Sequence, residues 1–172
     1  MQVLTRPWGA MHIRVQGEGP AVVFANSLGT DLRLWDAVLP LLPPIRAIRF
    51  DKRGHGLSDL SDPHDIHALA DDAAALIEQV AGGPVVFVGL SIGGAIGQAL
   101  AAARPDLVRA LVLASFLLPF LGVSGVSVLS AGLAAGLALG RCLEGSARRM
   151  VARARSTRSP QSSACHSTAW PK

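Results

Sequence analysis

The first 114 residues alternate between short apolar runs and longer segments with helical spacing of apolar residues. Short apolar runs bounded by turn residues are typical of buried strands, and an alternating run is typical of a half-exposed strand. On this basis the pattern predicts strands over residues 10–16, 21–26, 45–50, 85–89 and 107–115.

Apolar residues at steps of three and four predict two clear helices, over residues 63–80 and 92–103, and a short one over 34–42. Asp62 is expected to cap the first helix, with Pro63 in its first turn. Strands and helices in this order favour an α/β fold with a mostly parallel sheet and flanking helices.

Composition is consistent with one globular domain. The chain has 172 residues, half of them apolar, which is enough to bury a core. Residues 1–20 lack the apolar centre of a secretory signal. Cys142 and Cys165 do not have metal-ligand spacing, so neither a zinc site nor a disulfide framework is expected. The expected location is the cytoplasm.

Charge is spread unevenly along the chain. Residues 1–114 hold 9 Lys and Arg against 11 Asp and Glu, a balance of −2. Residues 115–172 hold 7 Lys and Arg against a single acid, Glu144, a balance of +6. Such asymmetry is typical of a tail that binds nucleic acid or membrane, or of a tail of different origin.

The segment "GLSIG" (89–93) is the main candidate for chemistry. It fits the G-x-S-x-G pattern and lies between a predicted buried strand and a predicted helix. In a nucleophile elbow of this kind Ser91 projects its hydroxyl over the sheet edge, and the Ile92 amide can stabilise an oxyanion. The alternative is a glycine-rich turn without a catalytic role, or one that binds phosphate.

Two further loops follow predicted strands and are expected at the same sheet edge. In "NSLGTD" (26–31) the Leu28 amide is the candidate second oxyanion donor. In "DKRGHGLSD" (51–59), Asp51 and Arg53 are expected to pair and fix a structural loop. His12, His64 and His67 are expected to face solvent.

Together these stretches resemble the α/β-hydrolase superfamily, and most closely the 3-oxoadipate enol-lactonases. The resemblance covers roughly residues 1–114. It implies that Ser91 is the nucleophile and that the Leu28 and Ile92 amides form the oxyanion hole. It also implies hydrolysis of a small-molecule lactone or ester in aromatic catabolism, without metal or organic cofactor and without nucleic acid.

The resemblance stops near Ala114, before the downstream acid and histidine that activate such a serine. Among residues 115–172 the only acid is Glu144 and the only histidine is His166, and neither follows a recognisable strand. No catalytic acid or histidine is therefore identified. Without the last strands and the cap of helices, the strand at 107–115 is expected to be an exposed apolar edge.

Three interpretations of the aberrant tail, residues 115–172, remain open. A frameshifted or truncated terminus is favoured, because the family pattern ends abruptly in an acid-poor segment. A membrane-associated, non-catalytic protein is the alternative, since residues 110–140 carry no charge, although Pro119 argues against a continuous helix. A basic arm around residues 148–158 is the third. We expect a hydrolase-type chain with little or no activity.

Overall fold

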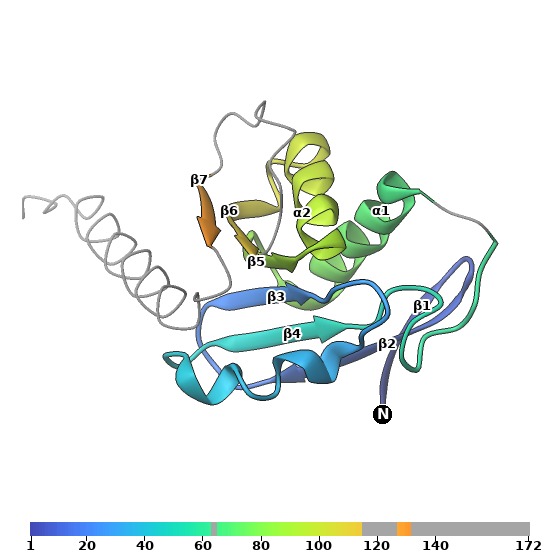
Figure 1. Cartoon of the computed structure of the whole chain (residues 1–172), viewed down its shortest axis with the longest axis horizontal. Coiled ribbons are helices and arrows are strands. Elements are labelled where there is room, and N and C mark those ends of the chain that lie inside the picture. Colours follow the sequence, from blue (N-terminus) through green and yellow to red (C-terminus); the bar gives the residue numbers. More distant parts are fainter. Residues whose placement is uncertain (63–64, 115–126, 132–172) are drawn as a thin grey trace, which may run out of the picture.

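The computed structural model describes residues 1–62, 65–114 and 127–131, and the fold is stated for these residues. Seven strands within them form one sheet in the order β1-β2-β4-β3-β5-β6-β7 (Figure 1). β1 and β4 each pair antiparallel with β2, whereas β4, β3, β5, β6 and β7 run parallel. The predicted mostly parallel sheet is therefore confirmed. The strands are β1 (Gln2–Arg6), β2 (Gly9–Gln16), β3 (Ala21–Ala25), β4 (Arg46–Phe50), β5 (Val85–Leu90), β6 (Val108–Ala114) and β7 (Ser127–Ala131).

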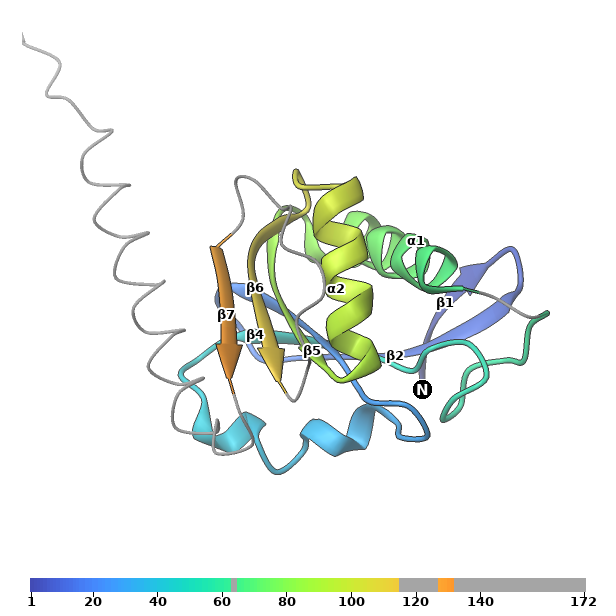
Figure 2. The ribbon, with the colours of Figure 1, turned by 45° about the horizontal axis from the view of Figure 1, so that its top comes forward.

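The strand predicted at 107–115 is not an edge of the sheet. β7 pairs with β6 in parallel, with Ala110 opposite Ser127 and Ala114 opposite Ala131 (Figure 2). The prediction of an exposed edge was wrong because residues beyond 115 supply a strand that occupies the backbone groups of β6 on that side. The short segment of β7 lies within a long uncharged run, which hides its boundaries in the sequence.

Two α-helices cover one face of the sheet, and short 3₁₀ helices lie on the other (Figure 1). The α-helices are α1 (Ile66–Leu76), continued by one π-helical turn, and α2 (Ile92–Ala103). Asp65 caps α1, and its side chain accepts a hydrogen bond from the Ala68 amide, so the prediction that Asp62 is the cap was wrong. The helix predicted at 34–42 is instead two 3₁₀ helices, Leu32–Trp35 and Leu39–Leu41.

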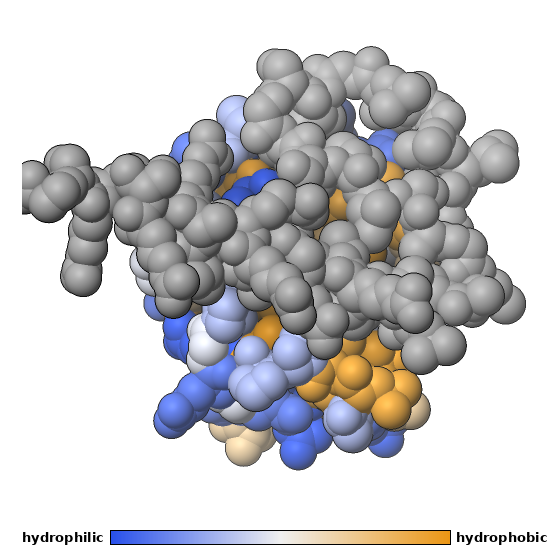
Figure 3. Space-filling view, turned by 90° about the vertical axis from the view of Figure 1, so that its left-hand side faces the viewer, coloured by the Kyte–Doolittle hydropathy of each residue, from blue (hydrophilic) through white to orange (hydrophobic). Residues whose placement is uncertain are grey.

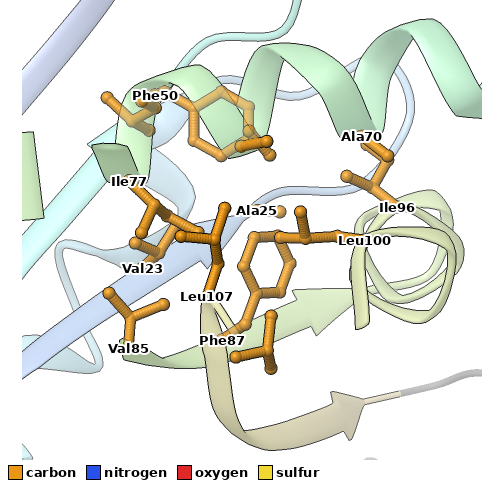
Figure 4. Close-up of a cluster of buried hydrophobic side chains, with 14 of the residues drawn as sticks. Val23, Ala25, Phe50, Ala70, Ile77, Val85, Phe87, Ile96, Leu100 and Leu107 are labelled. Atoms are coloured by element: carbon orange, nitrogen blue, oxygen red, sulfur yellow. The ribbon is translucent and has the colours of Figure 1, made fainter. Parts of the chain in front are cut away.

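Alternating side chains along the central strands build a core on each face of the sheet. Val23 and Phe87 pack under α1 and α2 in the larger cluster (Figure 4). Phe24, the neighbour of Val23, points to the opposite face and packs against Trp35, with ring centroids 5.1 Å apart. A strand buried on both faces requires this continuous apolar run, which explains why the sequence pattern located β3 and β5.

The molecule is not uniformly polar on its surface. Hydrophobic and hydrophilic side chains both reach the face seen in Figure 3. Among the described residues Leu28, Leu41 and Leu57 are exposed by 64% or more. Two of them, Leu28 and Leu57, belong to the loops at the carboxyl edge of the sheet, where a substrate pocket is expected.

Candidate active site

Three loops meet the carboxyl edge of the parallel strands. β3, β4 and β5 are neighbours in the sheet and end at Ala25, Phe50 and Leu90. Because parallel strands end at one edge, the loops that begin at Asn26 and Asp51 and the turn at Ser91 all start there. The sheet therefore brings the three loops of the predicted site, which are far apart in the sequence, to one edge of the fold.

Ser91 has a backbone conformation that L-amino acids rarely adopt. Its φ is 53° and its ψ is −117°, and it is the one non-glycine residue with positive φ among the described residues. Such conformations cost about 1–3 kcal/mol and persist where the surroundings enforce them. Here the Ser91 amide donates to the Ala114 carbonyl at 3.1 Å, which fastens the turn to the end of β6.

The glycines on either side of Ser91 are required by close packing. A Cβ at Gly89 would lie closer than 3.0 Å to the backbone of Gly93 and Gly94, and one at Gly93 would lie closer than 3.0 Å to the Ala25 backbone. The first turn of α2 therefore crosses the end of β5 and touches the end of β3. This packing gives a physical reason for the spacing G-x-S-x-G.

The start of α2 leaves backbone amides available above the turn. The amides of Gly94 and Ala95 donate to the Ser91 carbonyl at 2.8 and 3.3 Å. The Ile92 and Gly93 amides, at the first helical positions, have no carbonyl partner among the described residues. Since the helix dipole adds positive potential there, the Ile92 amide suits a developing oxyanion.

The loop after β3 is held by its own hydrogen bonds. Thr30 Oγ1 donates to the Ser27 carbonyl at 2.9 Å, and the buried Asn26 side chain donates to the carbonyl and hydroxyl of Thr30. The Leu28 side chain is exposed, and Gly29 has a φ of 69° in open space. Contact between Gly93 and Ala25 brings the start of this loop against the Ser91 turn.

A buried lysine, which the sequence analysis did not single out, holds the loop after β3 through hydrogen bonds to its backbone. Lys52 is 1% exposed, and its Nζ donates to the carbonyls of Asn26 and Ser27 at 3.1 and 3.0 Å. Burial lowers the pKa of Lys52 to about 8, while the neighbouring Asp51 carboxylate acts in the opposite direction. The sequence signal was a cation two residues after the strand predicted at 45–50.

Asp51 pairs with a histidine and not with Arg53. Its Oδ2 lies 2.8 Å from His12 Nδ1. Its Oδ1 accepts a hydrogen bond from the Leu32 amide, and its Oδ2 accepts one from the Leu57 amide. The prediction that His12 faces solvent was therefore wrong, because its side chain is only 15% exposed. His67 is exposed as predicted, and His64 lies outside the described residues.

The His12–Asp51 pair has the appearance of a catalytic dyad but does not reach Ser91. The sheet order places β2 three strands from β5, which at normal strand spacing is about 14 Å. A general base acts within about 3 Å of the proton it removes. The pair lines a separate cavity of about 280 Å³ together with Asp31, Arg33 and others. The His12–Asp51 pair fixes the loop that follows β4.

Arg53 is bound to α1. Its guanidinium donates to Asp72 Oδ2 at 2.7 Å and lies over the Trp8 ring, 4.9 Å from the centroid. Asp72, 2% exposed, also accepts from Arg6 Nε and Trp8 Nε1. The expected Asp51–Arg53 pair is therefore replaced by two separate clusters, each anchoring the 51–59 loop to a different element.

The residues that would activate Ser91 are not provided by the described part of the chain. In residues 1–62, 65–114 and 127–131 the Ser91 hydroxyl has no side-chain hydrogen-bond partner. The same residues contain no group of three or more His, Cys, Asp or Glu side chains that could hold a metal ion. Glu144 and His166 lie outside the described residues.

No described helix is long and apolar enough to cross a bilayer. The apolar run at 110–140 contributes to β6 and β7 where it is described.

Comparison with known proteins identifies the family. A strand–turn–helix with a strained serine, placed at the carboxyl edge of a parallel sheet, defines an α/β protein of the hydrolase type. Residues 20–124 match the family model described as alpha/beta hydrolase fold, which is more than half of the chain. The chain belongs to the α/β hydrolase fold family.

The chain is similar to esterases, to a lipase and to lactonases. Lipase LipV of Mycobacterium tuberculosis is 42% identical over 105 residues, covering 60% of this chain and 40% of that protein. The 3-oxoadipate enol-lactonase 2 of Acinetobacter baylyi is 34% identical over 102 residues, covering 58% and 38%. The crystal structure of the enol-lactonase from Burkholderia xenovorans superimposes with a TM-score of 0.58 at 36% identity, covering 62% and 44%. The chain thus spans less than half the length of these relatives.

Proposed function

We propose that residues 1–114 carry the nucleophile and oxyanion donors of a serine hydrolase that acts on carboxylic esters or lactones. A small enol-lactone such as that of 3-oxoadipate is the favoured substrate, because relatives bearing that name match the same segment. The observation that carries the proposal is the strained conformation of Ser91, enforced by packing at Gly89 and Gly93. The cytoplasm remains the expected location.

The proposed chemistry follows from the positions of these groups. Ser91 Oγ attacks the carbonyl carbon, and the resulting oxyanion accepts hydrogen bonds from the Ile92 and Leu28 amides. Collapse expels the enol or alcohol and leaves an acyl-enzyme, which water hydrolyses. This sequence requires neither a metal nor an organic cofactor.

A serine hydroxyl needs a histidine to take its proton and a carboxylate to orient that histidine. Since neither is identified for Ser91, we expect the 172-residue chain to turn over slowly. In serine hydrolases, loss of the base lowers kcat by about 10⁶-fold. Slow covalent labelling is therefore a better test of the nucleophile than turnover.

The test of the nucleophile is exposure of the full chain to a fluorophosphonate, followed by peptide mass spectrometry. Attack by Oγ on phosphorus displaces fluoride and leaves a mass label after one event per molecule. We expect the label on Ser91, its loss in Ser91→Ala, and its retention in the matched control Ser61→Ala. A label spread evenly over serines would refute the nucleophile.

Turnover is measured on the same proteins with an aryl acetate and with an enol-lactone. We expect the unaltered chain to differ little from Ser91→Ala. Ready hydrolysis that Ser91→Ala abolishes would overturn the expectation of slow turnover, and it would strengthen the assignment of Ser91.

A further inference from the structure

Lys52 occupies an unusual position for a lysine. It is almost fully buried, although lysine is rarely buried unless it is paired. Among the described residues its ammonium makes no ion pair within 4.0 Å, and its partners are the carbonyls of Asn26 and Ser27. The ammonium of Lys52 therefore interacts with backbone groups of a single loop, the one that follows β3.

The geometry of the peptide unit links Lys52 to the proposed oxyanion donor. The Ser27 carbonyl and the Leu28 amide belong to the same planar unit, and the described chain has no cis peptide. In a trans unit the C=O and N–H bonds point in opposite directions. Because Lys52 holds the Ser27 oxygen toward the interior, the Leu28 N–H points away from Lys52.

The charge also strengthens the donor. Hydrogen bonds in series polarise one another, by about 10–30% per bond. An ammonium on the Ser27 oxygen withdraws electron density from the peptide unit and makes the Leu28 N–H a better donor. Thr30 also donates to the Ser27 oxygen, through its hydroxyl at 2.9 Å, so two side chains hold this peptide plane.

We infer that Lys52 is a positioning residue for the oxyanion hole: its buried ammonium fixes and polarises the peptide unit that presents the Leu28 amide. This inference rests on the proposed function of Ser91 and Leu28. It assigns a role to a side chain that touches no substrate and acts through the backbone alone.

Asp51 is the charged neighbour whose field acts on Lys52, and it is itself held by His12 and by the Leu32 and Leu57 amides. The lowered pKa of about 8 leaves the ammonium charged at neutral pH. The hydrogen bonds from the Lys52 ammonium to the Asn26 and Ser27 carbonyls are therefore intact at pH 7.

The test compares Lys52→Met with a matched control, Arg46→Met, in the full chain. Arg46 also donates to two backbone carbonyls, those of Val80 and Ala81 at 2.7 and 3.2 Å, but at the opposite end of β4. Both variants lose two cation–carbonyl hydrogen bonds, and only Lys52→Met loses them at the 26–31 loop. Lys52→Arg is the conservative variant that restores a cation.

Two quantities are measured at pH 7: hydrogen exchange of the 26–31 amides, and the rate at which the fluorophosphonate labels Ser91. Circular dichroism confirms that each variant is folded. Since hydrogen bonds to charged groups shift equilibria by about 10-fold or more, Lys52→Met should accelerate the exchange and slow the labelling by that factor. Arg46→Met should leave both unchanged, and Lys52→Arg should recover part of the labelling.

The outcomes separate the two proposals. Labelling of Ser91 at the same rate in Lys52→Met and in the unaltered chain overturns the role of Lys52 and leaves the nucleophile standing. Equal slowing in Lys52→Met and Arg46→Met also overturns it, because the effect is then general destabilisation. If a long exposure labels Ser91 no faster than Ser61 in the unaltered chain, the nucleophile is refuted and the role of Lys52 in catalysis falls with it.

If Lys52→Met does not fold, Lys52→Arg alone decides the inference. If folded Lys52→Arg matches the unaltered chain in hydrogen exchange of the 26–31 amides and in the labelling rate of Ser91, the inference that a cation at position 52 holds this loop is supported. A folded Lys52→Arg that loses loop protection but keeps the labelling rate overturns it, since the labelling then does not depend on how the loop is held.

Discussion

Ser91→Gly should make the chain more stable than Ser91→Ala. Alanine keeps the Cβ that is strained at φ 53° and ψ −117°, whereas glycine adopts positive φ without that penalty. The Ser91 side chain makes no capping hydrogen bond, so removal of the hydroxyl has little cost of its own in either variant. The pair of variants therefore isolates the strain at this one residue.

The expected magnitude follows from two opposing terms. Relief of strain contributes about 1–3 kcal/mol. The greater freedom of glycine in the unfolded chain opposes this by about 0.4–1 kcal/mol. We expect a net gain of roughly 1 kcal/mol for glycine over alanine, which is a shift of about 0.5 M in the urea midpoint for an m-value near 2 kcal/mol/M.

Urea unfolding followed by circular dichroism measures this difference. Ser61 provides the matched control, because it has an ordinary negative φ, and there glycine should be less stable than alanine. Opposite signs at the two serines are the expected result. If glycine is no more stable than alanine at position 91, strain is not stored at this turn, and the main observation behind the proposed function loses its physical basis.

Three further predictions follow from individual contacts. Gly93→Ala places a Cβ against the Ala25 backbone and should lower the free energy of unfolding by about 1–3 kcal/mol in urea, with loss of Ser91 labelling; unchanged labelling would contradict the close approach. Asp72→Ala leaves the guanidinium groups of Arg6 and Arg53 without their carboxylate and should cost about 3 kcal/mol, whereas the exposed neighbour in Asp71→Ala should cost almost nothing; equal costs would count against the cluster. The pKa of Lys52 is about 8 in the folded chain against 10.5 unfolded, so between those values the unfolded chain binds more protons and stability rises with pH. The free energy of unfolding of the unaltered chain should therefore increase relative to Lys52→Met from pH 8 to pH 10, and a decrease would show the pKa shift to have the wrong sign.

Local patterns in the sequence were sufficient for most of the regular structure. β3, β5, β6 and α2 were located by apolar runs and by helical spacing, because burial on both faces of a sheet or on one helix face imposes those periods. The turn at Ser91 was also local, since the glycines and the serine that it needs lie within five residues. The fold class followed from the order of these elements.

The errors in secondary structure had three separate causes. β1 was missed because only Leu4 of its five residues is buried. Two 3₁₀ helices replaced the helix predicted at 34–42, where Pro40 interrupts the regular hydrogen bonds. β7 became visible only through its pairing with β6, since nothing in a glycine-rich apolar run marks a strand by itself.

The sequence by itself determined the α/β order of elements and the strained serine turn, because both depend on residues close together in the chain. Only the tertiary structure decided which polar groups meet. Apart from the Leu57 amide, which is 6 positions from Asp51, the partners described for Asp51, Lys52 and Asp72 lie 19 to 66 positions away, and no local pattern encodes a hydrogen bond over that distance. Such pairs are chosen by sheet register and helix packing, which exist only once the chain has folded.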